Sequence, residues 1–124
     1  MSYFADLSPH TYTPTHGLNV VNVGWLDEAH PFPQGDSPKE FQDALRRLCE
    51  NPIQLHRGFH LCQFCHRDTQ PARGNGQIRI KGSCGTWFAA PTMVHHYVIA
   101  HRYLPPATFI DAVFRPAGIA TDRH

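Results

Sequence analysis

The sequence predicts a small α+β domain in which an antiparallel sheet of about four strands packs against two or three helices. Segments rich in β-branched residues and segments with helical periodicity follow one another in the order β-α-β-β-β-α-α. The chain has 124 residues, of which 41% are hydrophobic, and this length suits one core rather than two. The closely spaced Cys62 and Cys65 then predict a knuckle between two strands that a metal ion stabilises.

The first third of the chain is expected to contain an arm, a strand and a loop. Residues 1–16 are rich in Pro, Thr, Ser and Tyr without periodicity, which is typical of an extended N-terminal arm. Residues 18–25 are rich in β-branched side chains and predict a strand. Residues 27–36 contain two closely spaced prolines, which exclude a helix and a central strand and therefore predict a loop.

A helix start is expected directly after this loop. Ser37 can cap the helix, Pro38 suits the first helical position, and Glu40 completes a capping box. Apolar residues at helical spacing follow, and the Asn-Pro pair at 51–52 ends the helix.

Three strands are expected around the cysteine pair. Residues 53–61 predict a strand with a kink at Gly58, and this strand runs directly into the pair. Residues 68–76 predict a loop that ends in a hairpin-prone Asn-Gly dipeptide. Residues 77–81 alternate polar and apolar side chains, and residues 86–89 form the returning strand.

Two helices are expected in the last third. The first begins at Pro91 and reaches about residue 104, where a Pro-Pro pair stops it, and the second spans residues 107–114. We therefore expect residues 17–115 to form a single domain and residues 116–124 to form an irregular C-terminal tail.

Charge and hydropathy limit the classes of partner. The net charge is +1 with neutral histidines, and acidic and basic residues are mixed, so no basic stripe indicates a nucleic-acid binder. No apolar run approaches the roughly 20 residues that span a bilayer, and the first residues lack the pattern of a signal peptide. We therefore expect a cytoplasmic protein without a membrane partner, for which a nucleic-acid partner is disfavoured. In that compartment thiols serve metals more often than disulfides.

The cysteine pair supplies half of a candidate metal site. Cysteines separated by two residues can chelate one zinc ion from a tight turn, and zinc then needs two more nitrogen or sulfur ligands. The same spacing also occurs in thioredoxin-like redox centres, where the pair begins a helix. Here Cys65 is followed instead by a Pro- and Gly-rich loop, which favours the metal.

The other half is expected from histidines of the helix that follows. His101 falls on the apolar side of that helix, and His96 lies at its edge beside Met93. His95 falls beside Arg102 and is expected to face water. Residues five positions apart point about 140° apart on an ideal helix, so shared coordination requires a distorted last turn. The expected Zn²⁺ ligands are Cys62, Cys65, His96 and His101.

Other interpretations of these residues remain open. His60 lies two residues before Cys62 on the expected strand, so it could replace either helical histidine. Cys49 and Cys84 could complete a site of four cysteines. Buried free thiols and core histidines without any metal are the structural alternative.

Several motifs together resemble a family of short, uncharacterised bacterial proteins with a domain of unknown function. The motifs are GWLD at 24–27, RGxHxCxFC at 57–65, GNGxIR at 74–79 and HYxxxH at 96–101. The resemblance extends over residues 20–113 and implies a compact bacterial domain that groups the cysteine pair with the helical histidines. It implies no activity or substrate.

Enzymatic function is possible only in a limited form. A catalytic zinc keeps one open position and needs a nearby acid or base, for which Asp27, Glu28 or His30 are the candidates. The metalloprotease and deaminase patterns, the nucleophile elbow and the phosphate-binding loop are all absent from the sequence, so we assign no catalytic residue. A zinc-dependent hydrolase is therefore the alternative function.

A binding module is the preferred function. Residues 25–33 offer aromatic and proline side chains of the kind found at contact sites, although Trp25 and Phe32 could equally cover the core. The expected partner is another protein, such as a toxin or an effector. Weak nucleic-acid binding is a further alternative, through a patch formed by Arg73, Arg79, Lys81 and Arg102 with Tyr97 or Trp87.

Overall fold

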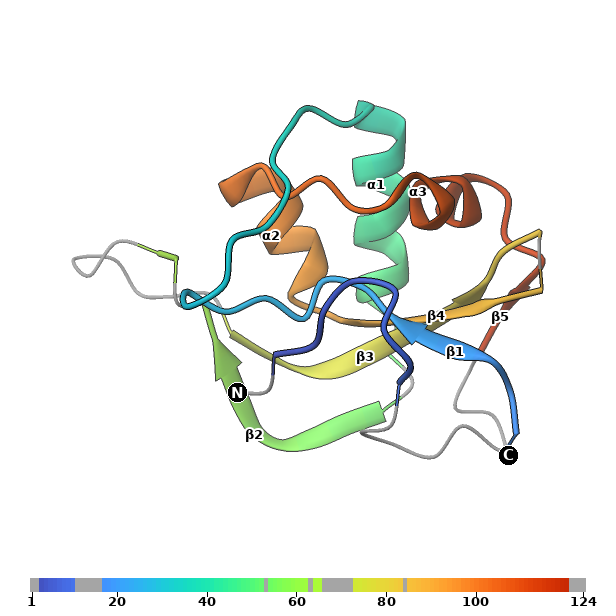
Figure 1. Cartoon of the computed structure of the whole chain (residues 1–124), viewed down its shortest axis with the longest axis horizontal. Helices are drawn as coiled ribbons and strands as arrows, with labels where there is room; N and C mark the ends of the chain where they lie inside the picture. The colour runs from blue at the N-terminus through green and yellow to red at the C-terminus, as the bar shows by residue number, and fades with distance from the viewer. Residues whose placement is uncertain are drawn as a thin grey trace.

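The computed structural model describes residues 3–10, 17–52, 54–62, 64–65, 73–83 and 85–120, with the main chain alone for 54–61 and 73–75. Within these ranges, three helices lie together on one side of a sheet (Figure 1). The helices are α1 (Lys39–Cys49), α2 (Val94–His101) and α3 (Ala107–Phe114). The strands are β1 (Val20–Asn22), β2 (Gln54–Leu61), β3 (Arg73–Lys81), β4 (Trp87–Pro91) and β5 (Gly118–Ile119). The predicted α+β class is confirmed.

The sheet is mixed rather than purely antiparallel. Its strands lie in the order β1-β4-β3-β2, and the short β5 also pairs with β3. β3 is antiparallel to β2, β4 and β5, whereas β1 runs parallel to β4. Parallel neighbours need a crossover between them, and here the chain passes through α1, β2 and β3 before β4 returns beside β1.

The core lies between β3 and the helices. Ile78 and Ile80 of β3 are buried together with Phe41 of α1 and Phe109 of α3. The rings of Phe41 and Phe109 meet edge to face with centroids 6.3 Å apart. Aromatic pairs of this geometry add about 0.5–1.5 kcal/mol beyond their burial, so this cluster fixes α1 and α3 on the sheet.

Gly24 lets the chain after β1 approach α2 closely. Its φ is +79°, and a Cβ atom there would lie 2.7 Å from Cγ2 of Val94. A side chain at this position would be strained by its backbone angle and would also clash with the first residue of α2. The glycine therefore sets how close α2 lies to β1.

Residues 3–10 extend the sheet beyond β1 and are tied to the core. Pro9 forms an antiparallel bridge with Val21. The carboxylate of Asp6 accepts a hydrogen bond from the hydroxyl of Tyr103 at 2.8 Å and from the main-chain N–H of Gly24 at 3.1 Å. Burial and the neighbouring Asp6 raise the pKa of Tyr103 well above its usual value, so this hydroxyl stays a donor.

The start of α1 differs from the predicted capping box. The N-cap is Pro38 and makes no side-chain capping bond. The hydroxyl of Ser37 instead accepts a hydrogen bond from Nε2 of Gln42 at 3.2 Å. The hydroxyl oxygen of Ser37, which was expected to cap the main chain of the helix, thus accepts a hydrogen bond from the side chain of Gln42 instead.

Two segments predicted as turn and helix belong to strands. Asn75 and Gly76 lie inside β3, where Gly76 is paired with Leu55 of β2, so pairing across the sheet overrides their hairpin tendency. Pro91 ends β4 opposite Gln77, and α2 begins three residues later at Val94. In β2 the register shifts between Leu55 and His60, around the predicted kink.

Candidate metal centre

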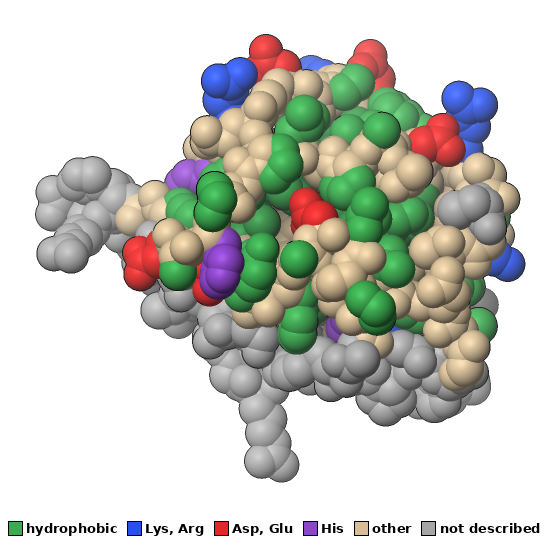
Figure 2. Space-filling model, viewed as in Figure 1, with side chains coloured by type: hydrophobic (Ala, Val, Ile, Leu, Met, Phe, Trp, Pro, Cys, Tyr) green, Lys and Arg blue, Asp and Glu red, His purple; other side chains and the backbone are tan. Residues whose placement is uncertain are grey.

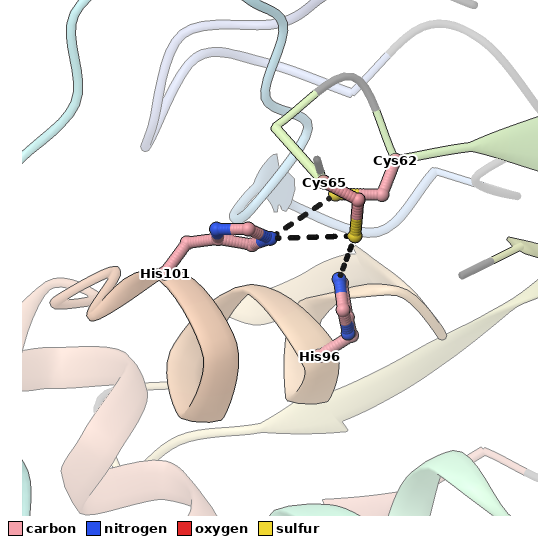
Figure 3. A group of neighbouring side chains, drawn as sticks. All are labelled: Cys62, Cys65, His96 and His101. Carbon is pink, nitrogen blue, oxygen red and sulfur yellow. Dashed lines mark hydrogen bonds between the residues drawn. The ribbon is translucent and has the colours of Figure 1, made fainter. Parts of the chain in front are cut away.

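Two elements bring the candidate ligands together. Cys62 directly follows β2 and Cys65 lies three positions further in the turn, while His96 and His101 project from α2. Figure 3 shows all four side chains pointing toward one another from the turn and the helix. Cys65 and His96, the two ligands from different elements that are nearest in sequence, are still 31 positions apart. The cluster therefore forms only when the chain folds.

The four ligand atoms form one compact group. Each residue offers one sulfur or nitrogen atom, and these atoms all lie within 4.8 Å of one another. Nε2 of His96 lies 3.3 Å from Sγ of Cys65, and Nε2 of His101 lies 3.4 Å from Sγ of Cys62 and 3.7 Å from Sγ of Cys65. Both imidazoles therefore face the thiols with the same ring nitrogen.

These distances fit the edges of a tetrahedral site. Zinc lies about 2.3 Å from sulfur and about 2.0 Å from nitrogen, so a tetrahedral sulfur-to-nitrogen edge is about 3.5 Å long. Three of the four sulfur–nitrogen pairs, at 3.3, 3.4 and 3.7 Å, lie on either side of that value, and all four ligand atoms lie within 4.8 Å of one another. The Cys₂His₂ cluster could therefore hold a metal ion.

The last turn of α2 is widened at the point where His101 leaves it. The main-chain N–H groups of Arg102 and Tyr103 both donate to the carbonyl oxygen of Tyr97, the second at 3.1 Å. A bond that spans five residues belongs to a π-type turn, which contains more residues than an α-helical turn. A wider turn is the kind of distortion that joint coordination by His96 and His101 requires, because the two would point about 140° apart on an ideal helix.

Aromatic side chains enclose one side of the cluster. The ring of Phe64, between the two cysteines, has its centroid 5.6 Å from that of His101, 5.8 Å from that of Tyr97 and 5.1 Å from that of Phe32. Burial, followed by the nearby Cys62, raises the pKa of Tyr97 well above its usual range. This side of the cluster is thus lined by aromatic rings.

The environment favours the neutral form of the two imidazoles. Burial lowers the pKa of His96, as do the neighbouring imidazoles of His101 and His95, and burial also lowers the pKa of His101. Only a neutral imidazole can bind a metal ion. Burial raises the pKa of Cys62, but a bound cation reverses that effect because it stabilises the thiolate.

The other sulfur and histidine candidates lie elsewhere. His95 is half-buried against α1, and burial followed by Arg46 lowers its pKa, so it does not simply face water as expected. Cys49 is a free thiol outside the cluster. Cys84 and the side chain of His60 lie outside the described part of the chain, so the alternatives that use them stay predictions.

The loop residues considered for catalysis form a separate pair. Nδ1 of His30 lies 2.7 Å from Oδ1 of Asp27, and the ring of Tyr3 stacks on the imidazole at 3.8 Å. Neither residue belongs to the group that could hold a metal. Trp25 is buried, and its indole N–H donates to the carbonyl oxygen of Ala89, so this ring belongs to the core rather than to a contact surface.

Sequence reasoning did not identify two residues that support the cluster. Nε2 of Gln34 donates to the carbonyl oxygen of His101 at 3.2 Å, across 67 positions of sequence. Phe64 packs directly on the ring of His101. The place of Phe64 between the cysteines was a usable signal, whereas nothing in the sequence marks Gln34.

Comparisons with known proteins give a family without an assigned activity. No curated protein and no solved structure matched the chain. No helix in the described ranges has the length and apolarity that crossing a bilayer requires. A family model matches residues 2–114, nearly the whole of the described fold. The chain therefore belongs to the family described as Domain of unknown function (DUF7919).

Proposed function

We propose that this protein is a zinc-stabilised module that binds another protein. The observation that carries the proposal is the convergence of Cys62, Cys65, His96 and His101, whose ligand atoms all lie within 4.8 Å of one another. Thiolate and imidazole together favour zinc over the hard cations that prefer oxygen. Four protein ligands complete its tetrahedral shell, as in structural rather than catalytic zinc sites.

The place of the cluster supports a structural role. The cluster links the turn after β2 to α2, two elements that are far apart in the sequence. A small domain buries a limited fraction of its surface, so an internal cross-link contributes a large share of its stability. For such sites the free energy of metal binding is also free energy of folding.

Catalysis is the second candidate and rests on the bond between His30 and Asp27. A carboxylate that orients an imidazole is a common arrangement for a general base. A catalytic zinc, however, keeps a coordination position for water, and the four-residue cluster leaves none. The geometry thus favours the binding module.

A protein partner suits the face drawn in Figure 2 better than a nucleic acid does. Figure 2 shows hydrophobic side chains spread over the face in view, with Lys and Arg side chains at its periphery. A nucleic-acid site would instead concentrate cations. A toxin or effector is the class of partner that we propose for this small domain.

Metal analysis of the purified protein tests the zinc site directly. We expect about one zinc ion per chain, and replacement by Co²⁺ should give the visible absorption of a tetrahedral site with thiolate ligands. Protein that contains no zinc, with Cys62 and Cys65 freely alkylated in the native state, would refute the proposal. A five- or six-coordinate Co²⁺ spectrum would instead indicate an open position and favour catalysis.

A further inference from the structure

We propose that residues 32–36 form a docking edge, on which an extended segment of a partner protein pairs main chain to main chain. This inference rests on the proposed binding function and specifies where the partner binds and in what conformation. The docking edge lies in the loop beside the metal centre, next to the ring of Phe64.

One side of this segment is already paired. The main-chain N–H of Leu104 donates to the carbonyl oxygen of Pro33 at 3.0 Å, and that of Gly35 donates to the carbonyl oxygen of Arg102 at 2.9 Å. Gln34 thus faces Tyr103 as a non-hydrogen-bonded antiparallel pair. In such a pair the N–H and C=O of Gln34 point away from Tyr103, to the other side of the segment.

The opposite side of the segment has all of its main-chain N–H donors, and these donors have no partner within the described ranges. The main-chain N–H groups of Phe32, Gln34 and Asp36 make no hydrogen bond to any described residue. Prolines occupy positions 31 and 33. These positions alternate with 32, 34 and 36, so their main-chain nitrogens face the side that is already paired. Every residue on the outer side therefore keeps its donor, although two prolines lie within the same stretch.

Two hollows flank the docking edge and share its side chains. One has a volume of about 470 Å³ and the other about 420 Å³, and Phe32, Gln34 and Phe64 line both. Arg102 lines the first, whereas Glu28 and His30 line the second. The docking edge thus offers two partly apolar hollows that share the side chains of Phe32, Gln34 and Phe64.

An extended polypeptide matches this arrangement. Its C=O and N–H groups satisfy those of Gln34, and its side chains on one face repeat about every 6.6 Å, so alternate residues can enter the two hollows. Phe32 and Phe64 favour apolar or aromatic side chains there.

The metal centre positions the docking edge. Gln34 donates from its side chain to the carbonyl oxygen of His101, and Gly35 donates to that of Arg102. Both acceptors lie in the widened end of α2, which presents His101 to the cysteines. An ion that orders this end also orders the docking edge, so binding of the peptide and of the ion should strengthen each other.

The test uses zinc-loaded protein and a phage-displayed library of random dodecapeptides. Selected peptides should carry apolar side chains at alternate positions and shift the amide resonances of Phe32, Gln34 and Asp36. Methylation of single main-chain nitrogens in the best peptide should weaken binding more than 10-fold at alternate positions and little at those between. Only a peptide bound as a strand gives this alternation.

Matched variants confirm the location. Phe32→Ala should weaken peptide binding more than 10-fold, while Phe114→Ala, which changes an exposed ring on α3, should leave it unchanged. Selection that yields no binder, a uniform methylation profile, resonance shifts elsewhere, or displacement of the peptide by single-stranded DNA would overturn the docking edge. Zinc content is measured on the same protein, so loss of the docking edge with zinc present is distinct from failure of the zinc site.

Discussion

The main-chain N–H of Arg102 donates a hydrogen bond to the carbonyl oxygen of Tyr97, five residues earlier, and Arg102 itself has a φ of 56°. A non-glycine residue rarely adopts this left-handed conformation, which costs about 1–2 kcal/mol. The surrounding structure maintains it at the residue directly after His101. The strained turn is therefore part of how α2 presents two histidines to the cysteine pair.

Arg102→Gly should relieve this strain without loss of zinc. Glycine adopts a positive φ freely, and the ion pair with Asp36 that is lost is largely exposed at 65% and 93%. We expect unchanged stability or a gain of up to about 1 kcal/mol, measured by urea unfolding. Arg102→Val should be destabilised instead, because a β-branched residue fits this conformation poorly. Destabilisation by glycine beyond about 2 kcal/mol would contradict the role of the strained turn.

Cys62→Ser and Cys65→Ser should abolish most cooperative unfolding. Each removes one of the proposed zinc ligands, and for a structural zinc site the lost metal affinity is lost folding free energy. Cys49→Ser is the control: it should retain zinc and cost about 1 kcal/mol, as an ordinary partly buried substitution does. Thermal unfolding with parallel zinc analysis checks this, and equal damage from Cys49→Ser would indicate that Cys49 also binds the ion.

The three histidines of α2 should differ in their effect on the metal. His101→Ala loses the residue in contact with both sulfurs and should lower zinc affinity more than about 100-fold, beyond the usual effect of residues around a metal's ligands. His96 contacts the sulfur of Cys65 but not that of Cys62, so His96→Ala should lower zinc affinity somewhat less. His95→Ala should leave zinc affinity unchanged and cost about 1 kcal/mol. Competition with a chromophoric chelator measures each affinity, and His60→Ala tests the alternative ligand.

Alkaline pH should destabilise the protein through Cys49. Burial raises the pKa of its thiol from 9.0 to about 12. The folded protein therefore keeps this proton after the unfolded chain has lost it, so the free energy of unfolding falls as pH rises above about 9. The pH dependence of urea unfolding should be weaker in Cys49→Ser. Native wild-type protein at neutral pH should also show no alkylation at Cys49, because the thiolate is the reactive form.

Sequence patterns predicted which helices and strands this fold contains better than they predicted where each one begins and ends. The apolar periodicity of α1 and α3 and the alternation of residues 77–81 depend on local spacing, so they placed these elements correctly. β3 extends four residues further toward its N-terminus, because pairing with β2 is a long-range contact that the Asn-Gly dipeptide does not reveal. The parallel pairing of β1 with β4 is equally invisible to local patterns.

Spacing also predicted the candidate cluster, together with the need for a distorted last turn in α2. Spacing could not predict how that distortion arises, because it depends on the conformation of Arg102 and on contacts from Gln34 and Tyr103. Each contact joins segments that are distant in sequence or fixes a backbone angle that arginine does not favour. Such features follow from the assembled fold alone.

The separation of the cluster into a turn and a helix also bears on how the chain reaches its native state. Cys62 and Cys65 are neighbours even in an unfolded chain, so they can capture an ion before any tertiary structure exists. The histidines lie 31 to 39 positions from the sulfurs that they contact, and β3 and β4 form between them. Closing a loop of this length costs conformational entropy that only later contacts repay. An ion carried by the cysteines would therefore bind the histidines only late in folding. Such an ion should slow unfolding far more than it accelerates folding.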